Sequence, residues 1–242
     1  MSDIMERFEL LSNGMKLLQQ DGAIRISTDS ILLADFCAPL RGKSVVDLGC
    51  GGGTLGILLC AADPDCRVIG VEIQEKACDI ARRNIEINAL EDRFRVVRAD
   101  LRALEGMLDA GSFDAVASNP PYFPAGSGLE PPDEAEAIAR TERLCTFDEL
   151  CASAARLLRH GGSFCLVHRP ERLAELLSTL RSRQLEPKRL RLVRHHAGAN
   201  VSLILVEARL GGSVGLKILP DLVLNGPSGA PSAEYRRIYH LP

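Results

Sequence analysis

The sequence predicts a doubly wound α/β fold, with a seven-stranded sheet that is mainly parallel and has an antiparallel last strand. From residue 44 onward, short apolar runs typical of buried strands alternate with stretches of helical periodicity. Strands that alternate with helices are connected by right-handed crossovers, which make the sheet mainly parallel. The last two apolar runs are joined by a turn at Gly198 instead of a helix, so we expect them to form an antiparallel pair.

Each element is predicted from its apolar pattern and from the residues that end it. The strands are expected at residues 44–48, 67–72, 94–100, 113–118, 163–168, 189–195 and 201–208. The helices are expected at residues 31–36, 54–62, 75–88, 147–158 and 170–183, with Gly161-Gly162 closing the fourth and Pro170 opening the fifth. A short strand at 24–26, a helix N-cap at 27–30 and a loop over 124–136 complete the prediction.

Composition limits the possible classes of protein. The 242 residues are 46% apolar, which permits a sizeable core, and we expect one domain with N-terminal elements over 1–43, a core over 44–208 and a C-terminal extension over 209–242. A net charge of −3 excludes a histone-like binder that works by bulk charge, although a local basic patch remains possible. The eight cysteines form no CxxC pair, the first residues lack an apolar signal core, and no apolar run reaches membrane-spanning length. We therefore expect a cytoplasmic protein with free thiols, no metal site and no membrane contact.

A glycine-rich turn and two acids mark a candidate ligand site. The turn Asp47-Leu48-Gly49-Cys50-Gly51-Gly52-Gly53 lies between a strand and a helix, where glycine lets the backbone approach a ligand. The next two strands end at Glu72 and Asp100. A carboxylate at the first of these ends can accept both hydroxyls of a ribose, and one at the second can accept an adenine amino group. Because parallel strands end at one crevice, these groups are expected to face the same ligand.

A nicotinamide cofactor is the natural competitor for such a turn. The fingerprint G-x-G-x-x-G can be started at Gly49 and Gly51, but Thr54 stands where its third glycine should fall. Asp47 also fits a different ligand, since its carboxylate can bind a cationic amino group. A measurement of NAD binding separates the two interpretations, and we expect none.

The tetrapeptide Asn119-Pro120-Pro121-Tyr122 follows the fourth strand. Two prolines stop a strand, so a plain loop is one interpretation. The other is chemical: the Asn119 side-chain carbonyl and the Pro120 backbone carbonyl can both accept hydrogen bonds from one planar NH₂ group. This favours a pyramidal nitrogen whose lone pair can attack a methyl group, while Tyr122 or Phe123 stacks on the planar substrate.

These motifs resemble known families. The turn and the acid-ended strand resemble the first motifs of class I S-adenosylmethionine-dependent methyltransferases over about 44–208, and the tetrapeptide resembles the catalytic motif of amino-methyltransferases. The segments 25–33, 137–142, 166–173, 215–220 and 233–239 extend the resemblance to bacterial transfer-RNA adenine-N6 methyltransferases, which modify adenosine 37 in the anticodon loop of a valine tRNA. One departure is Thr141, where many relatives carry His.

The resemblance implies a Rossmann-like fold, a single methyltransferase domain over 1–242, S-adenosylmethionine as cofactor and RNA, in particular tRNA, as partner. The implied catalytic residues are Asn119, Pro120, Pro121 and Tyr122. The implied cofactor-binding residues are Thr28, Asp29, Asp47, Gly49, Cys50, Gly51, Gly53, Glu72, Ile73, Asp100, Leu101 and Asn119. Substrate contacts are expected from Tyr122, Phe123, Arg140, Arg189, Arg191, Tyr235 and Arg236.

Two basic segments are candidates for the RNA surface. Residues 181–196 are rich in arginine and could contact phosphates, or they could be a solvated helix end and strand edge. The cluster at 235–239 combines tyrosine with arginine and could grip unstacked bases, or it could be a C-terminal helix that docks its tyrosines on the core. Two other functions stay open: an N5-glutamine protein methyltransferase, and an S-adenosylmethionine-binding RNA-interaction module without catalysis.

Overall fold

The computed structural model of the chain describes residues 7–11, 13–19, 28–40, 42–120 and 145–241. Its main sheet has the strand order β10-β8-β9-β7-β6-β3-β4-β5, with β11 also paired to β8. The strands are β3 Ser44–Leu48, β4 Arg67–Glu72, β5 Phe94–Arg98, β6 Phe113–Ser118, β7 Leu158–His168, β8 Leu185–Arg194, β9 Val201–Leu210, β10 Lys217–Ile218 and β11 Leu222–Val223. The seven predicted strands are all present in this sheet, which among the described residues gains the two-residue strands β10 and β11.

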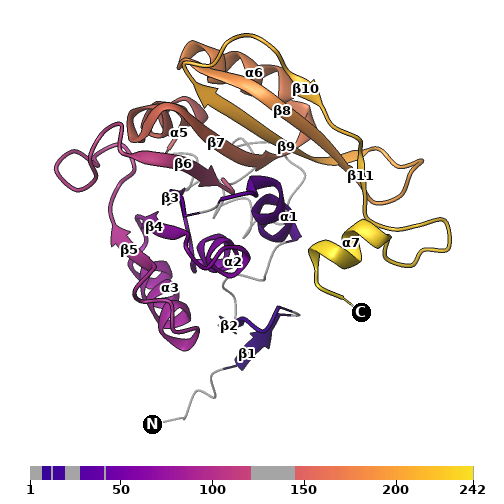
Figure 1. Ribbon diagram of the computed structural model, residues 1–242, viewed down its shortest axis with the longest axis horizontal. Helices are drawn as coiled ribbons and strands as arrows, with labels where there is room; N and C mark the ends of the chain where they lie inside the picture. The colour runs from indigo at the N-terminus through magenta and orange to yellow at the C-terminus, as the bar shows by residue number, and fades with distance from the viewer. Residues whose placement is uncertain (1–6, 12, 20–27, 41, 121–144, 242) are drawn as a thin grey trace, which may run out of the picture.

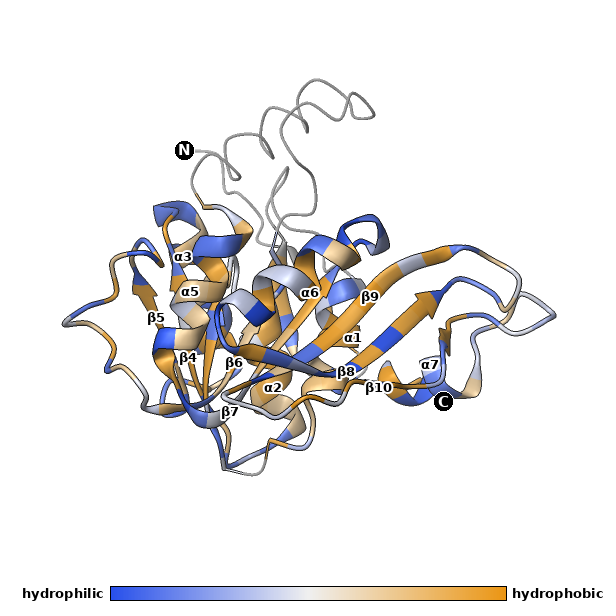
Figure 2. Ribbon diagram, turned by 90° about the horizontal axis from the view of Figure 1, so that it is seen from above, coloured by the Kyte–Doolittle hydropathy of each residue, from blue (hydrophilic) through white to orange (hydrophobic). Residues whose placement is uncertain are grey.

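The sheet directions confirm the predicted fold class. Strands β3 to β7 pair in parallel with their neighbours, whereas β9 is antiparallel to both β7 and β8. The last strand in the predicted order therefore lies between β7 and β8, and the long β8–β9 pair extends to one side of the molecule (Figure 2). The central strands are hydrophobic along their length, as strands covered on both faces must be (Figure 2).

Helices cover both faces of the sheet (Figure 1). The helices α1 Thr28–Cys37, α2 Thr54–Ala62 and α3 Glu75–Ile87 lie on one face, and α5 Phe147–Leu157 and α6 Leu173–Ser182 lie on the other. Side chains such as Leu33, Ile57 and Phe94 form the core of the first face. Leu150 and Leu176 belong to the core of the second. Two packed layers on one sheet leave the carboxyl ends of the strands as the place for a ligand.

Several element boundaries differ from the prediction, among them the end of β5, at Arg98 instead of residue 100, and the start of β8, at Leu185 instead of residue 189. The helix predicted to reach residue 158 ends at Leu157, because Leu158 pairs with Phe113 and starts β7, so Gly161-Gly162 lies inside a strand. The helix predicted from Pro170 opens with the 3₁₀ turn η1, Pro170–Arg172, before α6. Helix α1 begins at Thr28, inside the segment predicted to be only its cap. The predicted strand at 24–26 and loop at 124–136 lie outside the described residues.

Two terminal elements complete the described chain. An N-terminal hairpin, β1 Arg7–Leu10 and β2 Lys16–Gln19, was not predicted, and it attaches to α3 through Asn84, whose side-chain oxygen accepts the Leu18 amide at 2.7 Å. The C-terminal helix α7, Ala233–Ile238, packs beside α1 and β11. Within the described ranges, no helix combines the length and hydrophobicity that crossing a membrane requires.

Candidate active site

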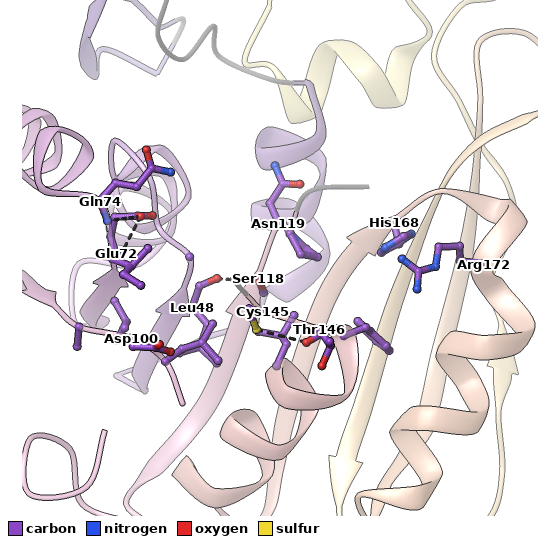
Figure 3. A pocket seen from close by; sticks show the side chains of 18 residues that line it. Leu48, Glu72, Gln74, Asp100, Ser118, Asn119, Cys145, Thr146, His168 and Arg172 are labelled. Carbon is purple, nitrogen blue, oxygen red and sulfur yellow. Dashed lines mark hydrogen bonds between the residues drawn. The ribbon is translucent and has the colours of Figure 1, made fainter. Parts of the chain in front are cut away.

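A cavity of about 150 Å³ opens where the parallel strands end (Figure 3). It is bounded by the ends of β3, β4, β5, β6 and β7 and by the start of α5. The predicted site residues that line it are Gly49, Glu72, Ile73, Asp100, Leu101, Asn119 and Pro120. The structure thus brings together the ends of β3, β4 and β5 and the start of the tetrapeptide, which are far apart in the sequence.

Glu72 ties the glycine turn to the start of α3. Its Oε2 accepts the Gly51 amide at 3.0 Å, and its Oε1 accepts the Ile73 and Gln74 amides, each at 2.9 Å. A carboxylate has about four lone-pair positions. The bonds that the structure describes fill those of Oε1 and leave one on Oε2. Glu72 is therefore a support of the turn as well as a candidate acceptor for a ribose hydroxyl.

Asp47 lies below the turn, at the end of β3, and its side chain is 1% exposed. Burial raises the pKa of Asp47 to about 7; the backbone amide of Gly56 lowers it and the nearby Glu72 carboxylate raises it. Among the described residues, its Oδ2 has no hydrogen-bond partner. A buried carboxylate oxygen in this state is suited to a cationic group, which would supply both a hydrogen bond and a counter-charge.

The turn itself requires glycine at its key positions. Gly49 has φ +72° and lines the cavity, and a Cβ there would meet no atom of the described residues within 4 Å, which leaves room for a ligand to approach the backbone. The Gly49 and Cys50 amides both donate to the Val71 carbonyl, at 2.9 and 3.0 Å. The Cys50 side chain points toward Gly70 and does not contribute to the cavity lining.

Asp100 is the more exposed of the two strand-end acids. Its carboxylate accepts hydrogen bonds from the Arg102 guanidinium, at 2.6 Å to Oδ2, and from the Arg102 amide, at 2.9 Å. The hydrogen bond from Arg102 holds the pKa of Asp100 below its usual value. Asp100 remains ionised at neutral pH and lies at the rim of the cavity, where Arg102 donates to both of its oxygens.

Asn119 stands in the middle of the cavity, between Glu72 on one side and His168 on the other (Figure 3). Its Nδ2 donates to the Ser30 hydroxyl oxygen of α1 at 3.0 Å. The preceding residue, Ser118, donates from its hydroxyl to the Leu48 carbonyl at 2.8 Å, which holds the end of β6 beside the start of the glycine turn. The amide is therefore placed by both the sheet and α1.

His168 and Arg172 were not among the predicted site residues, although both line the cavity. His168 ends β7, is 2% exposed and meets the Phe147 ring edge-on at 6.1 Å. Burial, and then the charge of Arg172, lower the pKa of His168 to about 4, so the ring is neutral at pH 7. Its Nδ1 accepts the Arg169 amide at 2.8 Å, which places the ring proton on Nε2. His168 ends a strand as Glu72 does, but a lone histidine at a strand end did not mark it as a site residue in the sequence.

The remaining predicted residues lie elsewhere. Thr28 and Asp29 open α1 and line a separate cavity with Tyr235. Asp47, Cys50, Gly51 and Gly53 belong to the turn but not to the cavity lining. The predicted residues Pro121, Tyr122, Phe123 and Arg140 lie outside the described residues, as does Thr141.

The predicted RNA surface is held by internal contacts. Arg189 pairs with Glu207 and its guanidinium lies 4.5 Å from the centre of the Phe36 ring, while Arg191 pairs with Glu234 at 2.7 Å. Further pairs in the basic segment join Arg181 to Glu186, Arg183 to Asp148 and Arg194 to Asp221. The segment is therefore closer to a network of ion pairs than to a stripe of unmatched charge.

The C-terminal tyrosines pack inward. Tyr235 and Tyr239 stack with ring centres 4.2 Å apart and lie against the first hydrophobic core. Arg237 beside them pairs with Asp35 of α1 at 2.6 Å. The docking alternative for this cluster thus has direct geometric support. In the part of the chain that is described, no group of three or more His, Cys, Asp or Glu side chains gathers as a metal ion would need.

Known proteins similar to this chain are methyltransferases. The tRNA1(Val) (adenine(37)-N6)-methyltransferase of Porphyromonas gingivalis is 29% identical over 224 residues, which cover 89% of this chain and 87% of that protein. The enzyme of the same name from Aeromonas hydrophila is 28% identical over 214 residues, covering 88% and 87%. The crystal structure of a predicted O-methyltransferase, protein Atu636 from Agrobacterium tumefaciens, has a TM-score of 0.73 at 24% identity and covers 88% of this chain and 96% of that one, so the two share a fold.

The family match is carried by the region that builds the cavity. A sequence model described as the methyltransferase small domain matches residues 21–183, which include the glycine turn, both strand-end acids and the tetrapeptide. The match confirms the predicted enzyme class and, with it, the predicted cofactor, S-adenosylmethionine. On this evidence the chain belongs to the methyltransferase small domain family.

Proposed function

We propose that this protein transfers a methyl group from S-adenosylmethionine to the N6 amino group of an adenosine in RNA, and that its target is adenosine 37 of a valine tRNA. The observation that carries the proposal is the position of Asn119 and Pro120 on the cavity that Gly49 and Glu72 also line. Support for the target comes from the relatives named for this reaction, which align with most of the chain.

The cofactor would occupy the side of the cavity that the glycine turn and strand-end acids form. Gly49 would let the backbone approach it, the remaining acceptor position of Glu72 would take a ribose hydroxyl, and Asp100 would take the adenine amino group. The Oδ2 of Asp47, which has no hydrogen-bond partner in the described part of the chain, fits the ammonium group at the other end of the molecule. Thr28 and Asp29 would close over that end.

The acceptor amine would lie against Asn119 and Pro120, whose carbonyl oxygens would each accept one of its hydrogens. Bound S-adenosylmethionine supplies a methyl group on a positively charged sulfur, and transfer forms a nitrogen–carbon bond, breaks the sulfur–carbon bond and releases one proton. The two acceptors favour the pyramidal nitrogen that such an attack needs, and the remaining contribution of the protein is orientation.

The opposite side of the cavity is suited to a planar base. His168 presents a neutral imidazole there, and Phe147 supplies an aromatic ring beside it. A base must leave its stack for its amino group to reach Asn119, and an anticodon loop provides an unstacked base at little cost. Tyr122 and Phe123 would stack on it, with further RNA contacts from Arg140 and Arg236, whereas the internal contacts of Arg189, Arg191 and Tyr235 argue against the same role for them.

Incubation with total tRNA and labelled S-adenosylmethionine, followed by nucleoside mass analysis, tests the proposal. The expected result is N6-methyladenosine in the tRNA fraction, at one site in a valine tRNA. Label in protein alone would overturn the RNA assignment and favour methylation of a glutamine amide, which the same tetrapeptide also serves. Binding of S-adenosylmethionine without any transfer would favour an interaction module.

A further inference from the structure

Helix α1 reaches the centre of the active site through one side chain. Ser30 lies in the first turn of α1, 89 residues before Asn119 in the chain, and its hydroxyl oxygen accepts the Asn119 Nδ2–H at 3.0 Å. Ser30 is 7% exposed, so water competes little for this hydrogen bond. Helix α1 packs against α2, β7, β9 and α7, which makes it a firm base for the contact.

The hydrogen bond decides which edge of the amide the substrate meets. The terminal torsion of asparagine is broad, so without a partner the amide plane samples many orientations. With Nδ2 directed to Ser30, the carbonyl Oδ1 occupies the opposite edge of the group. The amine that receives the methyl group donates hydrogen bonds, so it needs the Asn119 oxygen opposite it. If Nδ2 faced the amine instead, the N–H groups of both would repel each other.

We infer that Ser30 is a positioning residue for methyl transfer: by accepting the Asn119 Nδ2–H, it holds the Asn119 carbonyl toward the methyl-accepting amine. The inference rests on the proposed function in so far as Asn119 polarises that amine. It assigns to α1, which precedes the glycine turn and the tetrapeptide, a part in the chemical step.

The test compares Ser30→Ala, Ser30→Thr and wild type in steady-state methyl transfer and in cofactor binding. We expect Ser30→Ala to lower kcat about ten-fold, the effect of one neutral hydrogen bond, with an unchanged Kd for S-adenosylmethionine and an unchanged melting temperature within a few degrees. Ser30→Thr keeps the hydroxyl and is expected to restore most of kcat. Ser202→Ala is the matched control, because it removes a hydroxyl that bonds only to the Val193 carbonyl among described atoms, and it is expected to keep kcat.

Several results would overturn the inference. An unchanged kcat in Ser30→Ala would show that the amide does not need this partner. A loss of cofactor affinity as large as the loss of kcat, or a threonine variant as slow as the alanine variant, would assign Ser30 a role in folding alone. The kcat and Kd of each variant relative to wild type are measured on whichever substrate the wild type methylates. The result is therefore independent of which nucleoside or amide is modified.

Discussion

Functional residues were predicted both in the cavity at the strand ends and in the basic segment along β8. The two regions differ in whether their charged side chains have internal partners. In the cavity, the buried Asp47 keeps an oxygen without a partner among the described residues. Along β8, Arg189 and Arg191 each meet a carboxylate from a neighbouring element. The unsatisfied oxygen of Asp47 therefore points to a ligand more directly than the paired arginines of β8 do, and which charges find an internal partner is a property of tertiary structure.

The two regions also differ in how their residues were selected. The cavity residues were chosen because the ends of parallel strands must meet. The basic segment was chosen by local composition, which does not show that Glu207 and Glu234 lie opposite its arginines. If this contrast holds, substitutions in the cavity should change chemistry and cofactor binding strongly, whereas those along β8 should change stability slightly.

The largest effect is expected from Asn119→Ala. Removing the side-chain carbonyl takes away one of two groups that act on the amine, and transfer should fall at least about 100-fold, as when one donor of an oxyanion hole is lost. The Kd for S-adenosylmethionine should stay within a few-fold of wild type, because the turn and strand-end acids remain. Asn88→Ala, at the C-terminal end of α3, removes a side chain that bonds to Lys16 of the N-terminal hairpin; it serves as control and should keep full transfer. Full methylation by Asn119→Ala would remove the mechanism.

A smaller but still large effect is expected from Glu72→Ala. Glu72 accepts three backbone amides, so its loss should weaken cofactor binding more than ten-fold and lower the free energy of unfolding by about 3 kcal/mol. Asp100→Ala should weaken cofactor binding less and leave stability nearly unchanged, since its carboxylate bonds only to Arg102 among described residues. Calorimetric titration and thermal unfolding measure both quantities. A stronger effect from Asp100→Ala would reverse the assigned roles.

The ionisation of Asp47 makes a pH-dependent prediction. Because only the ionised carboxylate attracts the ammonium group, cofactor affinity should rise through pH 7 and level off above about pH 8, with up to a ten-fold change per pH unit below that. The same group should make the free protein less stable as pH rises from 3.8 to about 7, since the folded state binds its proton more tightly than the unfolded chain does. Asp47→Asn should bind weakly at every pH. Equal pH profiles for the two proteins would contradict this role.

The smallest effect is expected along β8. Arg191 donates to Glu234 and to the Pro220 carbonyl, so Arg191→Ala should lower the melting temperature by a few degrees through loss of contacts between β8 and α7. Binding of tRNA measured across a range of salt concentrations separates this role from phosphate contact. A phosphate contact would reduce the salt slope by about one on mutation, whereas the ion pair predicts no change in slope.

Much of the fold could be predicted because its centre consists of buried parallel strands, whose apolar runs are continuous and end at turn residues. The bounds of β3, β4 and β6 follow from that pattern alone. The end of the fourth predicted helix was wrong because a Gly-Gly pair is also typical of a helix end. In the structure Gly161-Gly162 lies within β7, which pairs with β6. The N-terminal hairpin was missed since the side chains that hold it, Asn84 in α3 and Asn88 just after that helix, lie far from it in the sequence.

The site residues also differ in whether the sequence alone could reveal them. Gly49, Glu72, Asp100 and Asn119 were found because each stands at a strand end, which sequence reveals. Ser30 depends on a contact between segments 89 residues apart, which no local pattern encodes. His168 stands at a strand end too, but a lone histidine is usually a core residue, so its place on the cavity needed the structure.

A crystal structure of the protein with S-adenosylhomocysteine tests the central claim most directly. The account predicts that the amino group of the ligand meets Asp47, that its adenosine lies beside Glu72 and Asp100, and that its sulfur faces the Asn119 carbonyl. A ligand bound elsewhere, or an Asn119 side chain turned away from the sulfur, would contradict it.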